Sequence, residues 1–133
     1  MSLLGGFWTR VTVRGHSMAP TFRDGQRLLV RRARPGTTCA RGDVVVFALT
    51  GEQIHYLGSA DIPYRVKRVA AVAGDRCPFW LRAALGAGPD ATIPPGHIAV
   101  SGDNSWSQDS RHLGTIESSA ILAILPARVT ARR

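Results

Sequence analysis

Lysine, cysteine and long apolar runs are all scarce in this chain of 133 residues. No apolar run approaches the roughly 18 residues that a membrane-spanning helix needs, so no transmembrane span is expected. The apolar start, residues 1–8, is too short to cross a bilayer and lacks the basic segment and cleavage site of a secretory signal. We interpret it as a short N-terminal segment in which Phe7 and Trp8 could contact a membrane interface.

The two cysteines, Cys39 and Cys77, exclude several kinds of site. They form no C-x-x-C pair, and no cluster of cysteine and histidine has zinc spacing, so neither a metal nor another cofactor is expected. They could form a single disulfide. A chain of this length buries enough surface to fold without one, however, which favours free thiols.

Acidic residues are also few, with 9 against 17 basic residues, which gives a net charge of +8 and a pI near 11.2. Such a charge attracts nucleic acid, acidic lipid or acidic proteins. The arginines are dispersed from Arg10 to Arg133, no basic run exceeds two residues, and the aromatic residues do not interleave with them. This dispersion disfavours nucleic acid as a partner. A non-enzymatic basic module that binds nucleic acid or an acidic membrane surface is kept as the alternative hypothesis.

The composition is that of one globular domain, which we assign to residues 1–133. Short strand-like segments separated by glycine, proline and aspartate turns predict a mainly β fold of six strands, with few helical turns and no large second β domain. Residues 79–85 indicate a helical turn, and residues 118–125 fit a helix or a buried strand equally well. The other strands are expected at residues 9–14, 26–32, 43–49, 65–72 and 97–100.

A candidate nucleophile follows the first of these strands. The segment Gly15–Thr21 reads GHSMAPT, and Pro20 keeps Ala19 out of the helical region, so the segment is extended or turned. Ser17 therefore lies on a rigid corner at the end of a strand. A serine hydroxyl is a weak nucleophile until a base removes its proton.

The histidines do not signal that base. The chain has neither a G-x-S-x-G elbow nor a Ser-His-Asp pattern. The remaining candidate is Lys67, the only lysine of the chain, which strand alternation places on one face with Val69 and Ala71. Such an apolar face lowers the pKa of an ammonium group, whereas an arginine could not lose its proton at all. The histidines are His16, His55, His97 and His112.

A second polar cluster, Ser101–Arg111, follows the strand expected before it. Asp109 and Arg111 are spaced to pair with each other in a tight turn. Ser107 or Ser110 could form a hydrogen bond with an amine. Composition alone would make this segment a solvated polar loop.

Taken in order, four motifs resemble the type I signal peptidases, a family that trims secretory precursors with a Ser/Lys dyad. Gly15–Thr21 resembles the nucleophile box G-x-S-M-x-P-T, and Arg41–Phe47 resembles the strand R-G-D-[IV]-V-V-F. Val66–Val69, continued by Gly74-Asp75, resembles the lysine box V-K-R-[VI]…G-D. Gly102–Gly114 resembles G-D-N-x-x-x-S-x-D-S-R-x-x-G. One motif is weakly specific, but four in order are strongly specific.

The resemblance implies a role for each matching residue. Ser17 would be the acylating nucleophile, and its backbone N–H would supply part of the oxyanion hole. Lys67 would be the general base, and Ser107 would hold its amine in place. Some members add a hydroxyl two residues before the nucleophile, where this chain has Gly15. Asp109 and Arg111 would form a structural ion pair. The residues expected to support the shape of the site are Gly15, Met18, Pro20, Asp103, Asn104, Asp109, Ser110 and Arg111.

The resemblance also implies a mostly β catalytic core and a precursor protein or peptide as substrate. That substrate would bind in extended form, as an added strand, and be cut after small residues of the Ala-x-Ala type. The chain departs from ordinary members in showing no N-terminal anchor. It also has Ala73 and Ser105 where the family has proline and arginine, and too few residues between Lys67 and Gly102 for the second β domain of larger members.

Two versions of this function stay open. A soluble, cytoplasmic enzyme would resemble the small anchorless relatives associated with nickel superoxide dismutase, and the missing span favours this version. The other version would lie peripherally at a membrane surface through Phe7, Trp8 and its positive charge. A self-cleaving repressor-type Ser/Lys protease is disfavoured, because no helix-turn-helix precedes Ser17.

Overall fold

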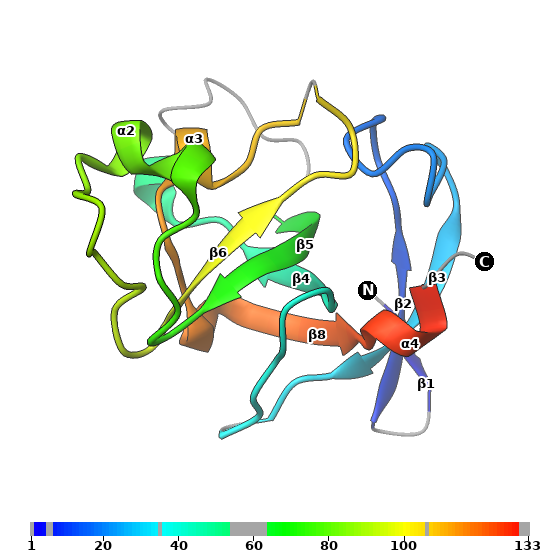
Figure 1. Ribbon diagram of the computed structural model, residues 1–133. Coiled ribbons are helices and arrows are strands. Elements are labelled where there is room, and N and C mark those ends of the chain that lie inside the picture. Colours follow the sequence, from blue (N-terminus) through cyan, green and yellow to red (C-terminus); the bar gives the residue numbers. More distant parts are fainter. Residues whose placement is uncertain (1, 5–6, 35, 54–63, 106, 131–133) are drawn as a thin grey trace.

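The computed structural model describes residues 2–4, 7–34, 36–53, 64–105 and 107–130. Within them, eight strands form one antiparallel sheet in the order β1-β2-β3-β8-β4-β5-β6-β7 (Figure 1). The strands are β1 (Ser2–Leu4), β2 (Trp8–Thr12), β3 (Arg27–Arg32), β4 (Val44–Ala48), β5 (Tyr64–Val72), β6 (His97–Ser101), β7 (Ile116–Glu117) and β8 (Ile121–Leu125). The short helices are η1 (Phe79–Leu81), α2 (Arg82–Leu85), α3 (Ser110–Leu113), η2 (Ser118–Ala120) and α4 (Ala127–Thr130).

This sheet confirms the mainly β fold predicted from the sequence. The five strands predicted at 9–14, 26–32, 43–49, 65–72 and 97–100 are present, with ends that differ by two residues at most, and the helical turn at 79–85 is present as η1 and α2. Residues 118–125 divide into the turn η2 and the strand β8, which pairs with both β3 and β4. The prediction of six strands was two too low, because β1 and β7 have only three and two residues, too few to show alternation.

The central strands are buried on both faces, and the apolar residues gather there. Successive side chains of Val44–Phe47 in β4 enter two apolar clusters alternately, and each is at most 1% exposed. A strand covered on both sides needs such a continuous apolar sequence. The first cluster also contains Met18 and Phe22, so the core anchors the turn that carries Ser17.

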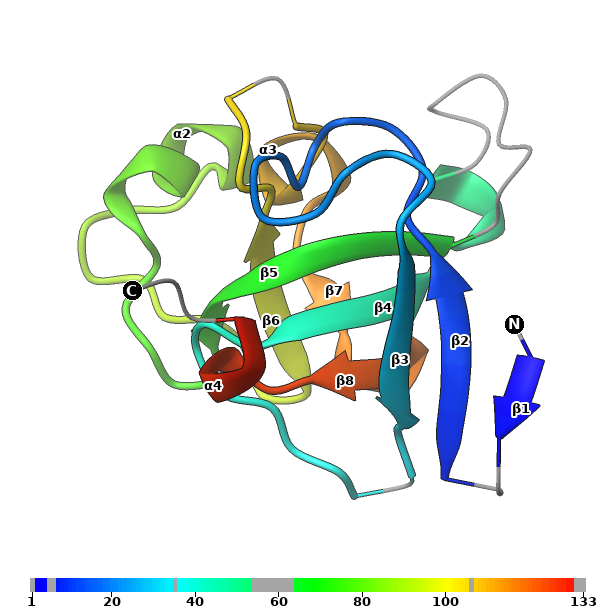
Figure 2. The same ribbon diagram turned by 90° about the vertical axis from the view of Figure 1, so that its right-hand side faces the viewer.

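The sheet curls, so strands that are distant in hydrogen-bond order meet at one end. The Tyr64 hydroxyl in β5 donates to the Thr12 carbonyl in β2 at 3.3 Å, although β3, β8 and β4 lie between these strands. In Figure 2, β3 crosses in front of β4 and β5, and the turn after β2 lies at the same end of the molecule as α3. This curvature brings the segments with the predicted site residues to one end of the sheet.

Both cysteines are free thiols; Cys39 is half-buried and Cys77 is buried. Cys77 packs with Leu81 and Ile93 in a third apolar cluster, beside α2. No helix in the described part of the chain is both long and apolar enough to cross a membrane.

Candidate active site

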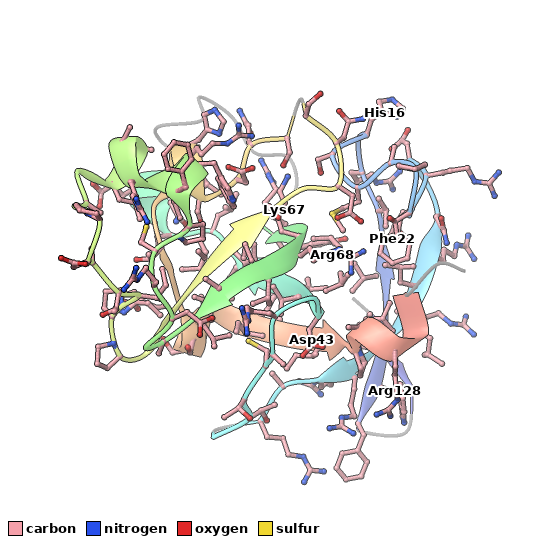
Figure 3. All side chains as sticks on the ribbon, in the orientation of Figure 1. His16, Phe22, Asp43, Lys67, Arg68 and Arg128 are labelled. Atoms are coloured by element: carbon pink, nitrogen blue, oxygen red, sulfur yellow. The ribbon has the colours of Figure 1, made fainter. Side chains whose placement is uncertain are left out.

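Lys67 lies in β5 with only 2% of its surface exposed. Val45 is directly opposite it on β4, and Val69 follows it on the same face of β5, so the side chain leaves the strand among apolar groups (Figure 3). Its Nζ donates a hydrogen bond of 3.0 Å to Oγ of Ser107. No carboxylate among the described residues forms an ion pair with this amine.

Burial lowers the pKa of Lys67 from 10.5 to about 8, because the ammonium group loses hydration. The negative charge of Asp109 opposes this shift in pKa, and the positive charge of Arg65, two residues earlier on β5, adds to it. A lysine with a pKa near 8 is neutral in roughly a tenth of the molecules at neutral pH, far more than an ordinary lysine. The amine can therefore accept a proton under mild conditions.

Ser107 belongs to the loop between β6 and α3, and Gly102 allows this loop to approach β5. Ser107 is buried, and its N–H donates to the carbonyl of Asn104 at 3.1 Å. A Cβ atom on Gly102 would collide with the Ser107 side chain and come within 2.6 Å of the carbonyl oxygen of Ser17. Ser107 and the turn that carries Ser17 therefore meet at Gly102.

The turn after β2 carries Ser17 and is fixed from both sides. On the core side, Met18 and Phe22 are buried, and the Phe22 N–H donates to the Met18 carbonyl at 2.9 Å. On the other side, the Ser17 carbonyl accepts a hydrogen bond of 3.0 Å from the N–H of Asn104. Pro20 is exposed in the same turn. The backbone of Ser17 is thus tied to the loop that holds Ser107.

The hydroxyl and the N–H of Ser17 are both available for a substrate. Ser17 is half-buried, and neither group has a hydrogen-bond partner among the described residues. The Lys67 amine therefore donates to Ser107 and not to Ser17. Gly15, at the start of the turn, has a φ of +81°, which favours glycine, and its N–H donates to the Asp24 carboxylate at 2.8 Å.

Arg68, the residue after Lys67, links β5 to the segments that carry Gly42 and Asp103, and through the Asp103 carboxylate to Thr21. Its Nε and Nη2 donate to both oxygens of Asp103 at 2.8 and 2.7 Å, and its Nη1 donates to the Gly42 carbonyl at 2.7 Å. The Thr21 hydroxyl also donates to Asp103, at 2.6 Å. Burial alone would raise the pKa of Asp103, but the hydrogen bonds from Arg68 and Thr21 outweigh it and lower that pKa.

Asp109 and Arg111 form an ion pair at the start of α3. Nε and Nη2 of Arg111 reach the two Asp109 oxygens at 3.0 and 3.1 Å. The Asp109 carboxylate also caps α3 by accepting from the Arg111 N–H, and the Asp109 N–H is 3.3 Å from Nδ1 of His112. The buried Ser110 hydroxyl accepts from the Val100 N–H at 2.8 Å. These contacts fasten the Ser107 loop to β6.

The family model described as signal peptidase, peptidase S26, matches residues 1–79. The chain belongs to the signal peptidase family. It is therefore a peptidase whose substrate is a peptide or a protein. The match includes Ser17 and Lys67 and ends before Gly102 and Ser107. No curated protein matches the chain.

This signal peptidase family member gathers its predicted site residues at one end of the sheet. Hydrogen bonds join Ser17, Asn104, Ser107 and Lys67 in sequence, whereas no hydrogen bond joins the Ser17 and Lys67 side chains within the described residues. Among the described residues, no group of three or more His, Cys, Asp or Glu side chains could hold a metal ion. His55 lies outside the described residues.

No role was predicted for Arg68, Thr21 or Gly102, although all three lie inside the matching motifs. Their positions in those motifs were the sequence feature that could have indicated a role in the site. Their contacts were hidden because they join distant segments; Thr21 and Asp103, for example, are 82 positions apart. The hydrogen bonds of Asp103 with Arg68 and Thr21, which we call the clamp around Asp103, thus join the contacts that shape the site.

Proposed function

We propose that this member of the signal peptidase family is a serine endopeptidase in which Ser17 is the nucleophile and Lys67 the general base. Buried Lys67, whose amine contacts a neutral hydroxyl, is the observation that carries the proposal. A pKa near 8 suits a base that must be neutral before it acts. Ser107 orients the amine, and the clamp around Asp103 and the Asp109–Arg111 ion pair support the loop.

In the first step, neutral Lys67 accepts the proton of the Ser17 hydroxyl as Oγ attacks the scissile carbonyl. The tetrahedral intermediate collapses when the Lys67 ammonium returns this proton to the leaving amine, which breaks the peptide bond and leaves an ester on Ser17. Lys67 then takes a proton from water, whose oxygen attacks the ester. The resulting ammonium returns its proton to Ser17 Oγ, which releases the acid product.

The backbone N–H of Ser17 is our candidate for the oxyanion hole. It has no acceptor among the described residues, and Gly15 offers no side-chain hydroxyl beside it. One such donor is typically worth about 3 kcal/mol of transition-state stabilisation. The hydrogen bond between Ser17 and Lys67 is expected to form when substrate closes the site, because such bonds are often loose in unoccupied enzymes.

The substrate in this proposal is a precursor with a leader, signal sequence or propeptide that ends in small residues of the Ala-x-Ala type. An extended segment would bind as an added strand. The short span between Lys67 and Gly102 resembles that of the small relatives associated with nickel superoxide dismutase, so we include the leader of a small soluble precursor among the substrates. We assign the activity to residues 1–133 as one catalytic domain.

Cleavage assays on a peptide library test this function. Each peptide contains one pair of small residues of the Ala-x-Ala type, and the residues around that pair are varied. Cleavage by the wild type, loss of cleavage in Ser17→Ala, and an acyl-enzyme mass on Ser17 are the expected results. Ser105→Ala, a change at an exposed serine in the β6–α3 loop, is the matched control and should keep its activity. Cleavage that survives in Ser17→Ala would exclude Ser17 as the nucleophile and with it the Ser17/Lys67 dyad. No cleavage of any peptide would instead favour the non-enzymatic basic module.

A further inference from the structure

The connection between β5 and β6, residues 73–96, places two aromatic side chains on the surface beside the active-site loop. Leu81 in η1 is fully buried and packs with Ile93 in the third apolar cluster, so the core holds η1 in place. Phe79 and Trp80, which precede Leu81, are nevertheless 81% and 42% exposed. Large apolar side chains that stay exposed on a fixed element are typical of a binding surface.

Trp80 forms one wall of an open pocket of about 340 Å³. The Arg111 guanidinium lies over the Trp80 ring, 5.8 Å from its centre. In Figure 1, α2, which follows Trp80, and α3, which carries Arg111, lie near each other at the end of the molecule to which β6 leads. Two segments that are distant in the chain therefore build this cavity. We call it the Trp80 pocket: Trp80, residues 101–105, Asp109 and Arg111.

Both carboxylates of the Trp80 pocket are already paired with arginines. Asp103 accepts from Arg68 at 2.8 and 2.7 Å, and Asp109 accepts from Arg111 at 3.0 and 3.1 Å. A lysine or arginine of a substrate would therefore meet no unpaired carboxylate among the described residues of the pocket. The Trp80 ring is left as the contact for a large apolar side chain, and aromatic rings pack well against one another.

The end of β6 determines where a bound precursor must leave the sheet. The last pair between β5 and β6 is Arg68 with Ser101, so residues 64–67 of β5 extend past the end of β6. A leader bound as an added strand beside residues 64–67 would place the cut near Lys67. Beyond the cut the precursor cannot continue along β5, because β6 occupies that edge from Arg68 onward. It must turn outward along residues 101–105, which line the Trp80 pocket.

We propose that the Trp80 pocket binds a large apolar side chain, preferably an aromatic one, in the part of the precursor that follows the cut. Asn104 connects this pocket with the nucleophile, because it lines the pocket while its N–H donates to the Ser17 carbonyl at 3.0 Å. A side chain held there would fix the scissile bond relative to Ser17. The inference deepens the proposed function and rests on it, since it adds a substrate feature on the other side of the cut from the Ala-x-Ala residues.

Matched peptides test the proposal with the full chain. Each contains one Ala-x-Ala sequence and has Phe, Ala or Lys at one of the first four positions after it. At one of these positions, kcat/KM of the wild type should be highest for Phe and lowest for Lys, with Phe roughly tenfold above Ala because its ring leaves water. In Trp80→Ala the ratio of Phe to Ala should fall to about twofold or less, whereas Trp80→Phe should keep most of it.

Trp8→Ala is the matched control. Trp8 is 44% exposed, close to the 42% of Trp80, but it belongs to β2 and does not line the pocket. This variant should keep the wild-type ratio of Phe to Ala. Because each ratio compares two peptides on one variant, a partial loss of folded protein does not alter it.

Binding without cleavage separates this inference from the proposed function. Ser17→Ala lacks the nucleophilic hydroxyl but retains Trp80. Fluorescence anisotropy with labelled peptides should show that Ser17→Ala binds the Phe peptide roughly tenfold more tightly than the Ala peptide, and that adding Trp80→Ala removes this difference. Equal affinities of Ser17→Ala for the two peptides would refute the inference whether or not the wild type cleaves them. A wild type that binds the peptides in this order but cleaves none would count against the proposed function alone.

Three further results would overturn the proposal. The first is a Phe-to-Ala ratio in Trp80→Ala that equals the wild-type ratio. The second is an equal loss of this ratio in Trp8→Ala, which would reduce the effect to general apolar adhesion. The third is a wild-type preference for Lys over Phe, which would make Trp80 a cation–π contact for basic side chains.

Discussion

Lys67 and Arg68 are neighbours on β5, but they project to opposite sides of the sheet, and their surroundings shift the pKa values of the two cations in opposite directions. Lys67 enters an apolar environment, its amine has the Ser107 hydroxyl as its one hydrogen-bond partner in the described part of the chain, and burial lowers its pKa to about 8. Arg68 points to the other side, where its hydrogen bonds to the Asp103 carboxylate raise its pKa. A cation held by a neutral hydroxyl can release its proton, whereas one held by a carboxylate becomes a structural tie.

The two sides also differ in what they connect. On the Lys67 side, the amine is hydrogen-bonded to Ser107 of the β6–α3 loop, and the Ser17 hydroxyl has no hydrogen-bond partner among the described residues. The Arg68 side fastens the β6–α3 loop to β5 and, through Thr21, to the turn that carries Ser17. One side is thus suited to chemistry and the other to keeping the same segments in place.

Exchanging the two kinds of cation should have the largest effect. Lys67→Arg keeps the positive charge but cannot supply a neutral base, so cleavage should fall on the order of 10³-fold. The reciprocal change, Arg68→Lys, keeps the charge of the clamp and should cost less than about tenfold, since Lys67 is untouched. Initial rates of peptide cleavage measure both. Activity retained in Lys67→Arg would remove Lys67 as the base.

The pH dependence should report the lowered pKa of Lys67. Because the folded pKa is depressed, the neutral and active form gains population as the pH rises toward about 8 and levels off above it. Two pH units below that midpoint, kcat/KM should be lower by about a hundredfold. A profile that is flat in this range, or one that climbs until pH 10.5, would contradict the lowered pKa.

Removing the hydroxyl partner of Lys67 should have a smaller effect. In Ser107→Ala the amine loses its hydrogen-bond acceptor but stays buried, so kcat should fall by roughly tenfold to thirtyfold while KM changes little. Ser107→Thr retains a hydroxyl and is the matched comparison. Equal kcat values for the wild type and Ser107→Ala would show that Ser107 does not orient the amine.

Weakening the clamp should mainly lower stability. Asp103→Asn removes a partly buried acceptor of charged hydrogen bonds and should reduce the free energy of unfolding by about 2 kcal/mol. Arg111→Gln is the contrasting change, because the Arg111 side chain is 40% exposed and the buried Asp109 carboxylate keeps its hydrogen bond from the backbone N–H of residue 111, so the loss should be about 1 kcal/mol. Urea unfolding compares the two variants. A larger loss in Arg111→Gln would reverse the assigned roles.

Local patterns were sufficient to predict most of the fold. The alternation in β2 and β3 and the continuous apolar run of β4 each correspond to one kind of strand environment. They were not sufficient for residues 118–125, because a buried central strand and a buried helix share the same apolar sequence. Tertiary pairing with β3 and β4 determines that β8 is a strand.

Contacts between segments distant in the chain could not be predicted from the sequence. The motifs predicted which residues would carry the site, but the bond from Thr21 to Asp103 depends on how the sheet curls. The aromatic and basic residues do not interleave along the chain. The register of β2 with β3 nevertheless places Trp8 beside Arg31.

Direct titration of the Lys67 amine is the most decisive measurement. Lysine occurs once in this sequence, so a chain labelled with ¹³C at lysine Cε gives a single lysine signal that needs no assignment. We predict that its chemical shift titrates with a midpoint near pH 8 in the folded protein and that the midpoint returns to the ordinary value in urea. A midpoint near 10.5 in the folded protein would contradict the claim that burial prepares Lys67 to act as a base.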